Sequence, residues 1–159
     1  MPLDQGSLSL LQSPVAQTLL ESTIPAHVAY TGSDGSPRVV PIWFYWNGEE
    51  IVLGSPPTSP KVAALTKHPK VAVSIDSSDW PYRVLLIRGT ATVTLVDGVV
   101  PEYAASAERY FGPEQGKAWV QQIGGMFAQM ARISIQPEWV GTLDFEQRFP
   151  GAIEAAMQG

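Results

Sequence analysis

The sequence contains no cysteine and only two histidines, His27 and His68. The lack of cysteine excludes disulfide bonds, thiolate nucleophiles and cysteine-ligated metals, and two imidazoles are too few for a histidine-rich metal centre. No run of about 18 apolar residues occurs, so the sequence predicts no membrane-spanning helix. Basic residues are also scarce: 10 oppose 15 acidic ones, and this net charge of -5 argues against a general nucleic-acid binder.

The remaining composition fits one folded domain. The chain has 159 residues, 45% of them hydrophobic, and a mean hydropathy of +0.02, which is too apolar for a disordered chain. We therefore expect a single domain over residues 1–159, with residues 1–12 loosely ordered. The first residues lack the basic segment and the apolar core of a signal peptide, so we expect a cytoplasmic protein.

Runs rich in β-branched and aromatic residues predict most of the secondary structure. The expected strands cover 26–31, 38–46, 50–54, 70–76, 82–96, 131–136 and 139–145. Asn47-Gly48 favours a tight type I′ hairpin, and Gly89 inside a long strand indicates a bend or bulge. Hairpins rather than helices join most strands, and closing such a sheet removes its exposed edges. The sequence therefore predicts a mainly β (α+β) fold built on an antiparallel barrel.

Proline positions predict where the helices begin. Ser13 suits an N-cap and Pro14 the first helical position of one helix. A second, short helix follows Pro60 and ends at His68-Pro69. Two more are expected at 101–110 and 113–123, joined at Gly112.

Lys61 is the most informative polar residue. It follows Thr58, Ser59 and Pro60, in the first turn of a predicted helix, where the partial positive charge makes a cation unfavourable by roughly a few tenths of a kcal/mol. A bound phosphate would make the lysine favourable at this position, because the helix N–H groups, the hydroxyls of Thr58 and Ser59 and the Lys61 ammonium can all contact the phosphate. An ordinary capped helix with a solvated lysine explains the same residues, so both interpretations stay open.

An aromatic run over residues 43–46 suggests a strand that is covered on both faces. Alternation puts Trp43 and Tyr45 on one face and Phe44 and Trp46 on the other. Either the core and a partner subunit cover them, or the core and a flat ligand. Arg38 lies on the same predicted strand and is, with Lys61, the cation we assign to a site. No side chain is assigned as an acid or base, so the chemistry of an enzyme would come from a cofactor.

Several of these segments occur in an order that resembles a known family. They are Asp34-Gly35-Ser36-Pro37, the strand at 39–44, Ser59-Pro60-Lys61-Val62, the run at 68–73 and Gly89-Thr90-Ala91. Together they span roughly residues 24–97 and resemble the pyridoxamine 5′-phosphate oxidase-like, FMN-binding split β-barrels.

The resemblance implies a six- to seven-stranded antiparallel split β-barrel with short flanking helices, acting as an FMN-dependent oxidoreductase on a small molecule. It implies that Ser59 and Lys61, with Thr58 nearby, bind the flavin phosphate. It further implies a homodimer with the cofactor sites at the subunit interface. The residues expected along the ring are Pro41, Ile42 and Trp43, with Trp80, Tyr82 and Trp139 from the partner chain.

Other members of the family leave alternatives open. Some bind 8-hydroxy-5-deazaflavin through a similar lysine, and others bind haem through a histidine, for which His27 and His68 are the candidates. The arginine-rich pattern of true pyridoxamine phosphate oxidases is not recognisable, so we do not expect vitamin B6 oxidation. A flavin-binding module without turnover, and a barrel dimer whose aromatic strand is only an interface, are the remaining interpretations.

Overall fold

The structure, a computed structural model, describes residues 4–159. Residues 1–3, the beginning of the expected loose segment, lie outside that range. Leu8–Gln12 forms a short 3-10 helix, η1, in which Leu10 and Leu11 are buried. The expectation of a loose start is therefore wrong for these residues, because their leucines complete the core.

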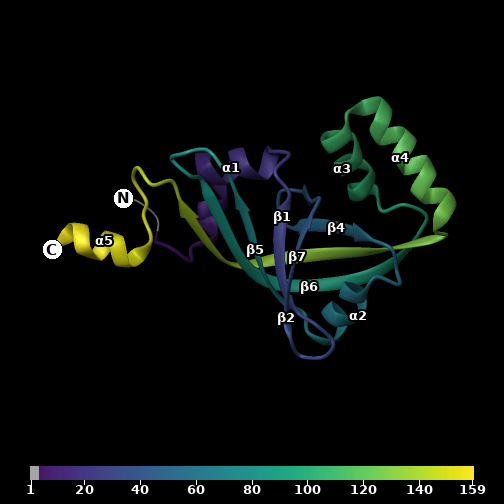
Figure 1. Cartoon of the computed structure of the whole chain (residues 1–159), viewed down its shortest axis with the longest axis horizontal. Helices are drawn as coiled ribbons and strands as arrows, with labels where there is room; N and C mark the ends of the chain where they lie inside the picture. The colour runs from purple at the N-terminus through teal and green to yellow at the C-terminus, as the bar shows by residue number, and fades with distance from the viewer. Residues whose placement is uncertain (1–3) are drawn as a thin grey trace.

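Within residues 4–159, seven antiparallel strands form one curved sheet (Figure 1). The strands are β1 (Ala26–Thr31), β2 (Pro37–Ile42), β3 (Tyr45–Trp46), β4 (Ile51–Ser55), β5 (Lys70–Asp76), β6 (Val84–Asp97) and β7 (Gln129–Leu143). Their order in the sheet is β2-β1-β5-β6-β7-β4-β3, so β2 and β3 are the two edges. The predicted mainly β, split-barrel fold is confirmed.

The described residues form five α-helices: α1 (Pro14–Glu21), α2 (Pro60–Lys67), α3 (Pro101–Phe111), α4 (Pro113–Met126) and α5 (Gly151–Gln158). The first four begin with a proline, whose fixed φ suits the first helical position, and all four were predicted. The helix α5 was not predicted. In Figure 1, α3 and α4 form a hairpin at one end of the molecule, and α5 lies at the opposite end. No helix of the described chain is long and apolar enough to cross a membrane.

Two strand predictions need correction. The expected strand at 38–46 is broken, because β2 ends at Ile42 and Phe44 turns into the core, where it is fully buried. The expected strands at 131–136 and 139–145 are one continuous strand, β7, which passes through Pro137. The proline is tolerated because it lies at an irregularity, where the register shifts between Arg88 and Gly89. This shift confirms the bulge predicted at Gly89.

The turn at Asn47-Gly48 also differs from the prediction. A type I′ turn needs positive φ at both central residues, but only Gly48 has it, at 97°. The connection spans residues 47–50, and the Asn47 Oδ1 accepts hydrogen bonds from the backbone N–H groups of Glu49 and Glu50. The asparagine side chain therefore stabilises a longer loop instead of the tight turn.

The core lies between the inner face of the sheet and the helices η1 and α1. Leu19 and Leu20 of α1 pack there with Ile75, Ile87 and Ile133, which the period-two alternation of their strands turns inward. A second, small cluster of Val100, Ile123 and Met130 lies under the α3–α4 hairpin. The hairpin thus packs on a hydrophobic cluster that is separate from the main core.

Replacing Gly89 by alanine tests the bulge. A Cβ at this position would overlap the carbonyl oxygen of Gln136 on the neighbouring strand. We expect Gly89→Ala to lower the free energy of unfolding by about 3 kcal/mol, measured by urea denaturation. Gly125→Ala is the control, since a Cβ there meets nothing within 4 Å and alanine favours a helix. Equal stability of the two variants would contradict the close approach at Gly89.

Candidate functional site

A hollow of about 370 Å³ lies where the end of β2, the end of β4 and the beginning of α2 meet the α3–α4 hairpin. Four of the predicted site residues line it: Pro41, Ile42, Trp43 and Lys61. The other lining residues, which the sequence reasoning did not assign to a site, are Gly54, Ser55, Pro56, Tyr103, Phe111 and Trp119. The structure therefore brings together one cation and a set of aromatic side chains from distant parts of the chain.

The break after β2 is held in place by the end of α3. Arg109 donates a hydrogen bond from Nη2 to the carbonyl of Phe44, and its guanidinium lies 4.8 Å from the centre of the Phe44 ring. The Tyr110 hydroxyl donates to the carbonyl of Ile24 at 3.1 Å, and burial raises the pKa of that hydroxyl. These contacts satisfy backbone carbonyls that leave the sheet ladder, so the break is a stable feature.

With Phe44 turned inward, Trp43 stays against the helices. Its ring is stacked on Tyr110 at 5.3 Å between centres and lies nearly perpendicular to Phe111, at 4.8 Å between centres. Tyr103 lies 5.9 Å away, tilted by 35°. Such aromatic pairs are worth about 1 kcal/mol beyond the area that they bury, so Trp43 forms a fixed wall of the hollow.

Lys61 lies in the hollow without an acidic partner. It is half-buried, and burial lowers the pKa of its ammonium group. No carboxylate of the described residues lies within 4.0 Å of it, and its Nζ donates instead to the Ser59 hydroxyl at 3.0 Å. Ser59 is the N-cap residue of α2, yet its side chain makes no capping hydrogen bond. Positive charge therefore accumulates at the beginning of α2, and an anion would compensate it.

Gly54 lets the helical hairpin approach the sheet. A Cβ on Gly54 would lie only 2.7 Å from the Cβ of Tyr103, so any other residue would push α3 away from β4. Trp119 of α4 donates from its indole Nε1 to the Tyr103 hydroxyl at 2.8 Å. The only signal of these residues in the sequence was the recurrence of aromatics on the two predicted helices, which does not show which sheet face they meet.

An ion pair holds the beginning of α3 over the same strands. Glu102 Oε2 accepts from Arg132 Nη2 at 2.7 Å, and Arg132 lies opposite Gly54 in the register of β4 and β7. The hydrogen bonds from Arg132 lower the pKa of the Glu102 carboxyl, and those to Glu102 raise the pKa of Arg132. The side chains are 19% and 27% exposed, so water screens this pair less than an ordinary surface pair.

Three of the residues predicted to bind the cofactor lie outside the lining: Arg38, Thr58 and Ser59. Arg38 is half-exposed and forms an ion pair with Asp34 at 3.1 Å. Hydrogen bonds from Ser36 and the charge of Arg38 lower the pKa of Asp34 to about 2. Thr58 is exposed, and Ser59 contacts the site through its bond to Lys61. Arg38 is thus tied into the β1–β2 hairpin of its own chain.

The residues predicted to come from a partner chain also lie outside this hollow. Trp80 and Tyr82 pack against Phe145, and Trp80 is 67% exposed. Trp139 lies under the Arg88 guanidinium, 4.0 Å from it, and lines a different hollow together with His27. Their role across an interface stays a prediction.

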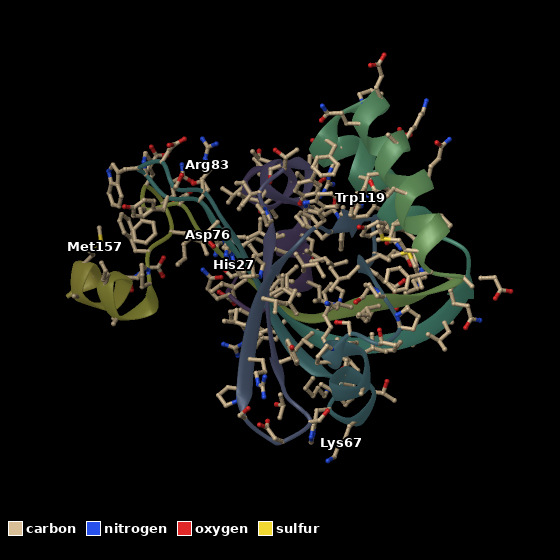
Figure 2. All side chains as sticks on the ribbon, turned by 45° about the vertical axis from the view of Figure 1, so that its right-hand side comes forward. His27, Lys67, Asp76, Arg83, Trp119 and Met157 are labelled. Atoms are coloured by element: carbon tan, nitrogen blue, oxygen red, sulfur yellow. The ribbon has the colours of Figure 1, made fainter. Side chains whose placement is uncertain are left out.

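Neither histidine lines the hollow. His27 Nδ1 lies 4.0 Å from Asp76 Oδ1, and His68 ends α2. Figure 2 shows His27 and Asp76 together on one side of the molecule and Trp119 on the other. The sheet also places Ser74 opposite His27, which the sequence did not suggest, but the Ser74 hydroxyl donates to Asp76.

The family model for pyridoxamine 5′-phosphate oxidase matches residues 13–144. The chain belongs to this family. No curated protein matches the sequence. Many solved structures do, among them one called F420 reductase, with 26% identity and a TM-score of 0.59 over 79% of this chain and 94% of that one.

Two further similar structures support the fold of this family member. A conserved hypothetical protein from Mycobacterium tuberculosis has 20% identity and a TM-score of 0.67, covering 92% of this chain and 91% of its own. An FAD-binding protein from Mesorhizobium loti has 18% identity and a TM-score of 0.55, covering 85% and 92%. The matched residues 13–144 include both the sheet and the α3–α4 hairpin, so the whole hollow lies inside the family domain.

The ion pair between Glu102 and Arg132 gives a pH-dependent prediction. We expect Glu102→Gln to lower the free energy of unfolding at pH 7 by about 1 kcal/mol, because a charged hydrogen bond is lost. The folded-state pKa of Glu102 is lowered, so its contribution is present above the unfolded value near 4.5 and is lost as the pH falls through the lowered value. The gap between wild type and variant, measured by urea denaturation, therefore closes in acid.

Glu138→Gln is the matched control for that experiment. Glu138 also pairs with a cation, Lys70 at 3.0 Å, but the lysine side chain is 75% exposed and the glutamate 48%. We expect little change in stability from this variant at any pH. An equal loss in both variants would show that Glu102 has no special role in holding α3.

Proposed function

We propose that this chain is an oxidoreductase that binds FMN in the hollow, with Lys61 and the beginning of α2 on the phosphate. The observation that carries the proposal is a half-buried lysine without an acidic partner, placed at a helix N-terminus beside an aromatic hollow. A phosphate dianion would satisfy both positive groups at once. When bound, a flavin accepts or donates a hydride, which is the chemistry that no side chain of the site supplies.

The residues of the hollow fit a flat cofactor. Trp43 and Phe111 present aromatic surface. Pro41 and Ile42 end the edge strand β2, which pairs with β1 on one side only, and Trp43 follows the strand, so backbone groups of this segment are available to polar ring atoms. The volume of about 370 Å³ lies within the roughly 300–1,000 Å³ of small-molecule sites. The predicted roles of Pro41, Ile42, Trp43 and Lys61 are kept in this proposal, and that of Arg38 is dropped.

The second candidate cofactor is an 8-hydroxy-5-deazaflavin. The similarity to the F420 reductase, at 26% identity over most of both chains, favours it. Its phosphate would bind at Lys61 in the same way, because the argument from charge depends on the phosphate and not on the ring. The two candidates therefore share the site and differ in which ring the aromatic walls accept.

We also propose that the protein is a homodimer and that the partner subunit contributes to each site. Trp80 and Tyr82 are 67% and 42% exposed and pack against Phe145, and the later helix α5 has no buried residue. Exposed aromatic groups of this size usually mark a contact surface. In a dimer, the partner's Trp80 and the partner's Tyr82 would cover part of the cofactor ring, and Trp139 has the same predicted role.

Lys61→Ala is the first test. We expect the affinity for FMN to fall by about 2 kcal/mol, roughly 30-fold, because a charged hydrogen bond to phosphate is lost, whereas the affinity for riboflavin stays the same. Titration of the protein into each flavin, followed by flavin fluorescence, measures both. The deazaflavin and its dephosphorylated form are titrated in parallel. Whichever of FMN and the deazaflavin binds more tightly is the preferred cofactor.

Lys67→Ala is the control, because Lys67 is an exposed lysine at the other end of the same helix. It should bind FMN like the wild type. Unchanged FMN binding in Lys61→Ala, or equal losses in both variants, would refute the phosphate assignment. Tight binding with no turnover by any reductant would identify a flavin-binding module instead of an enzyme.

The dimer is tested by sedimentation and by mixing variants. The chain should sediment at twice its mass of 17.2 kDa. Trp80→Ala should weaken FMN binding, as Lys61→Ala does, but an exchanged mixture of the two should regain high-affinity sites, since half of the sites in each mixed dimer carry neither change. A mixture that regains none would show that Trp80 acts within its own chain or not at all.

A further inference from the structure

We infer that the α3–α4 side of the hollow is a substrate subsite for a flat, apolar molecule that carries an uncharged, hydrogen-bond-accepting oxygen. This inference rests on the proposed function, since it assigns the substrate class of the same site. Three observations carry it: the aromatic walls, the absence of charge around them, and one tyrosine hydroxyl with a proton to donate.

The walls continue beyond the part of the hollow that holds Lys61. The Phe111 ring lies nearly perpendicular to those of Trp43 and Trp119, with ring centres 4.8 and 6.3 Å apart, and Phe111 is 45% exposed. A second hollow of about 220 Å³ lies against Phe111 and Trp119, where Gln115, Ala118 and Gln122 complete its lining. The two aromatic side chains thus line both hollows, which lie next to each other along the hairpin.

Charge is nearly absent from this surface. Among the described residues that line the two hollows, Lys61 is the one ionisable cation, and no carboxylate is present. The α4 side offers only the amides of Gln115 and Gln122. An ionic substrate placed between aromatic rings would lose hydration without gaining a counter-ion, which is strongly unfavourable. The surface therefore selects an uncharged molecule.

Tyr103 supplies the polar recognition. An indole N–H can only donate, so the bond from Trp119 Nε1 at 2.8 Å makes the Tyr103 oxygen the acceptor. The hydroxyl proton is then left for another acceptor, and no described residue accepts it in the structure's hydrogen bonds. Tyr103 lines the hollow, and its ring is fixed by the contact with Gly54. The hydroxyl is therefore a positioned donor for an oxygen of the ligand.

The experiment compares two probes with the same two-ring skeleton, 1-indanone, which has a carbonyl oxygen, and indane, which has none. Calorimetric titration of the purified protein gives the ratio of the two dissociation constants. Tyr103→Phe keeps the ring and removes the donor, so we expect the preference for 1-indanone over indane to fall about fivefold. Tyr45→Phe, on β3 outside both hollows, should keep the wild-type ratio.

A second measurement does not depend on a variant. The NMR signal of the Trp119 indole N–H should shift on adding 1-indanone to the wild-type protein and move less with indane, because only the ketone engages Tyr103. No saturable binding of 1-indanone, or an unchanged ratio in Tyr103→Phe, would overturn the inference.

The two proposals fail separately. Lys61→Ala should keep the wild-type preference for 1-indanone while it loses FMN, and Tyr103→Phe should keep FMN affinity while it loses the preference for the ketone. Loss of FMN binding in Tyr103→Phe with an unchanged ketone preference would place Tyr103 on the cofactor and overturn the substrate assignment.

Discussion

The attachment of α3 to the sheet is the constraint on which the site depends. At the end of α3, Arg109 binds the Phe44 carbonyl and lies over its ring, and at the beginning Glu102 pairs with Arg132 of β7. Between these two anchors Tyr103 packs directly on Gly54. Without this close attachment Trp43 would continue the strand, and the hollow would have no wall on its helical side.

The site combines two kinds of environment within one small volume. At the beginning of α2, the Lys61 ammonium and the helix N-terminus present positive charge that nothing in the described chain neutralises. Along the hairpin the lining is aromatic and nearly uncharged. A phosphorylated, flat cofactor matches both, because one end of such a molecule is a dianion and the other is a ring. In the proposed complex, this polarity would orient the cofactor, with its phosphate at Lys61 and its ring along the hairpin.

Several large apolar side chains stay exposed at the edge of the sheet and on the surface of the protein. The strand β2 is an edge strand with three exposed residues at its beginning, and Trp80, Val39 and Met157 are exposed large side chains. In contrast, the inner face of the sheet is closed by η1 and α1. This contrast between a covered inner face and exposed large side chains supports the proposed homodimer.

The sequence by itself determined the strands with strong alternation, the four helices that begin with proline, the bulge at Gly89 and the positive helix start at Lys61, since each depends on residues close together in the chain. It misplaced the break after Ile42, because the alternation of 43–46 is compatible with a strand, whereas the break is stabilised by residues of α3 such as Arg109, 65 residues from Phe44. The sequence also did not assign Tyr103 and Trp119 to the site, because they line the hollow through contacts with strands that are distant in the chain. Contacts between distant segments decided which aromatic side chains face Lys61, and only the tertiary structure contains them.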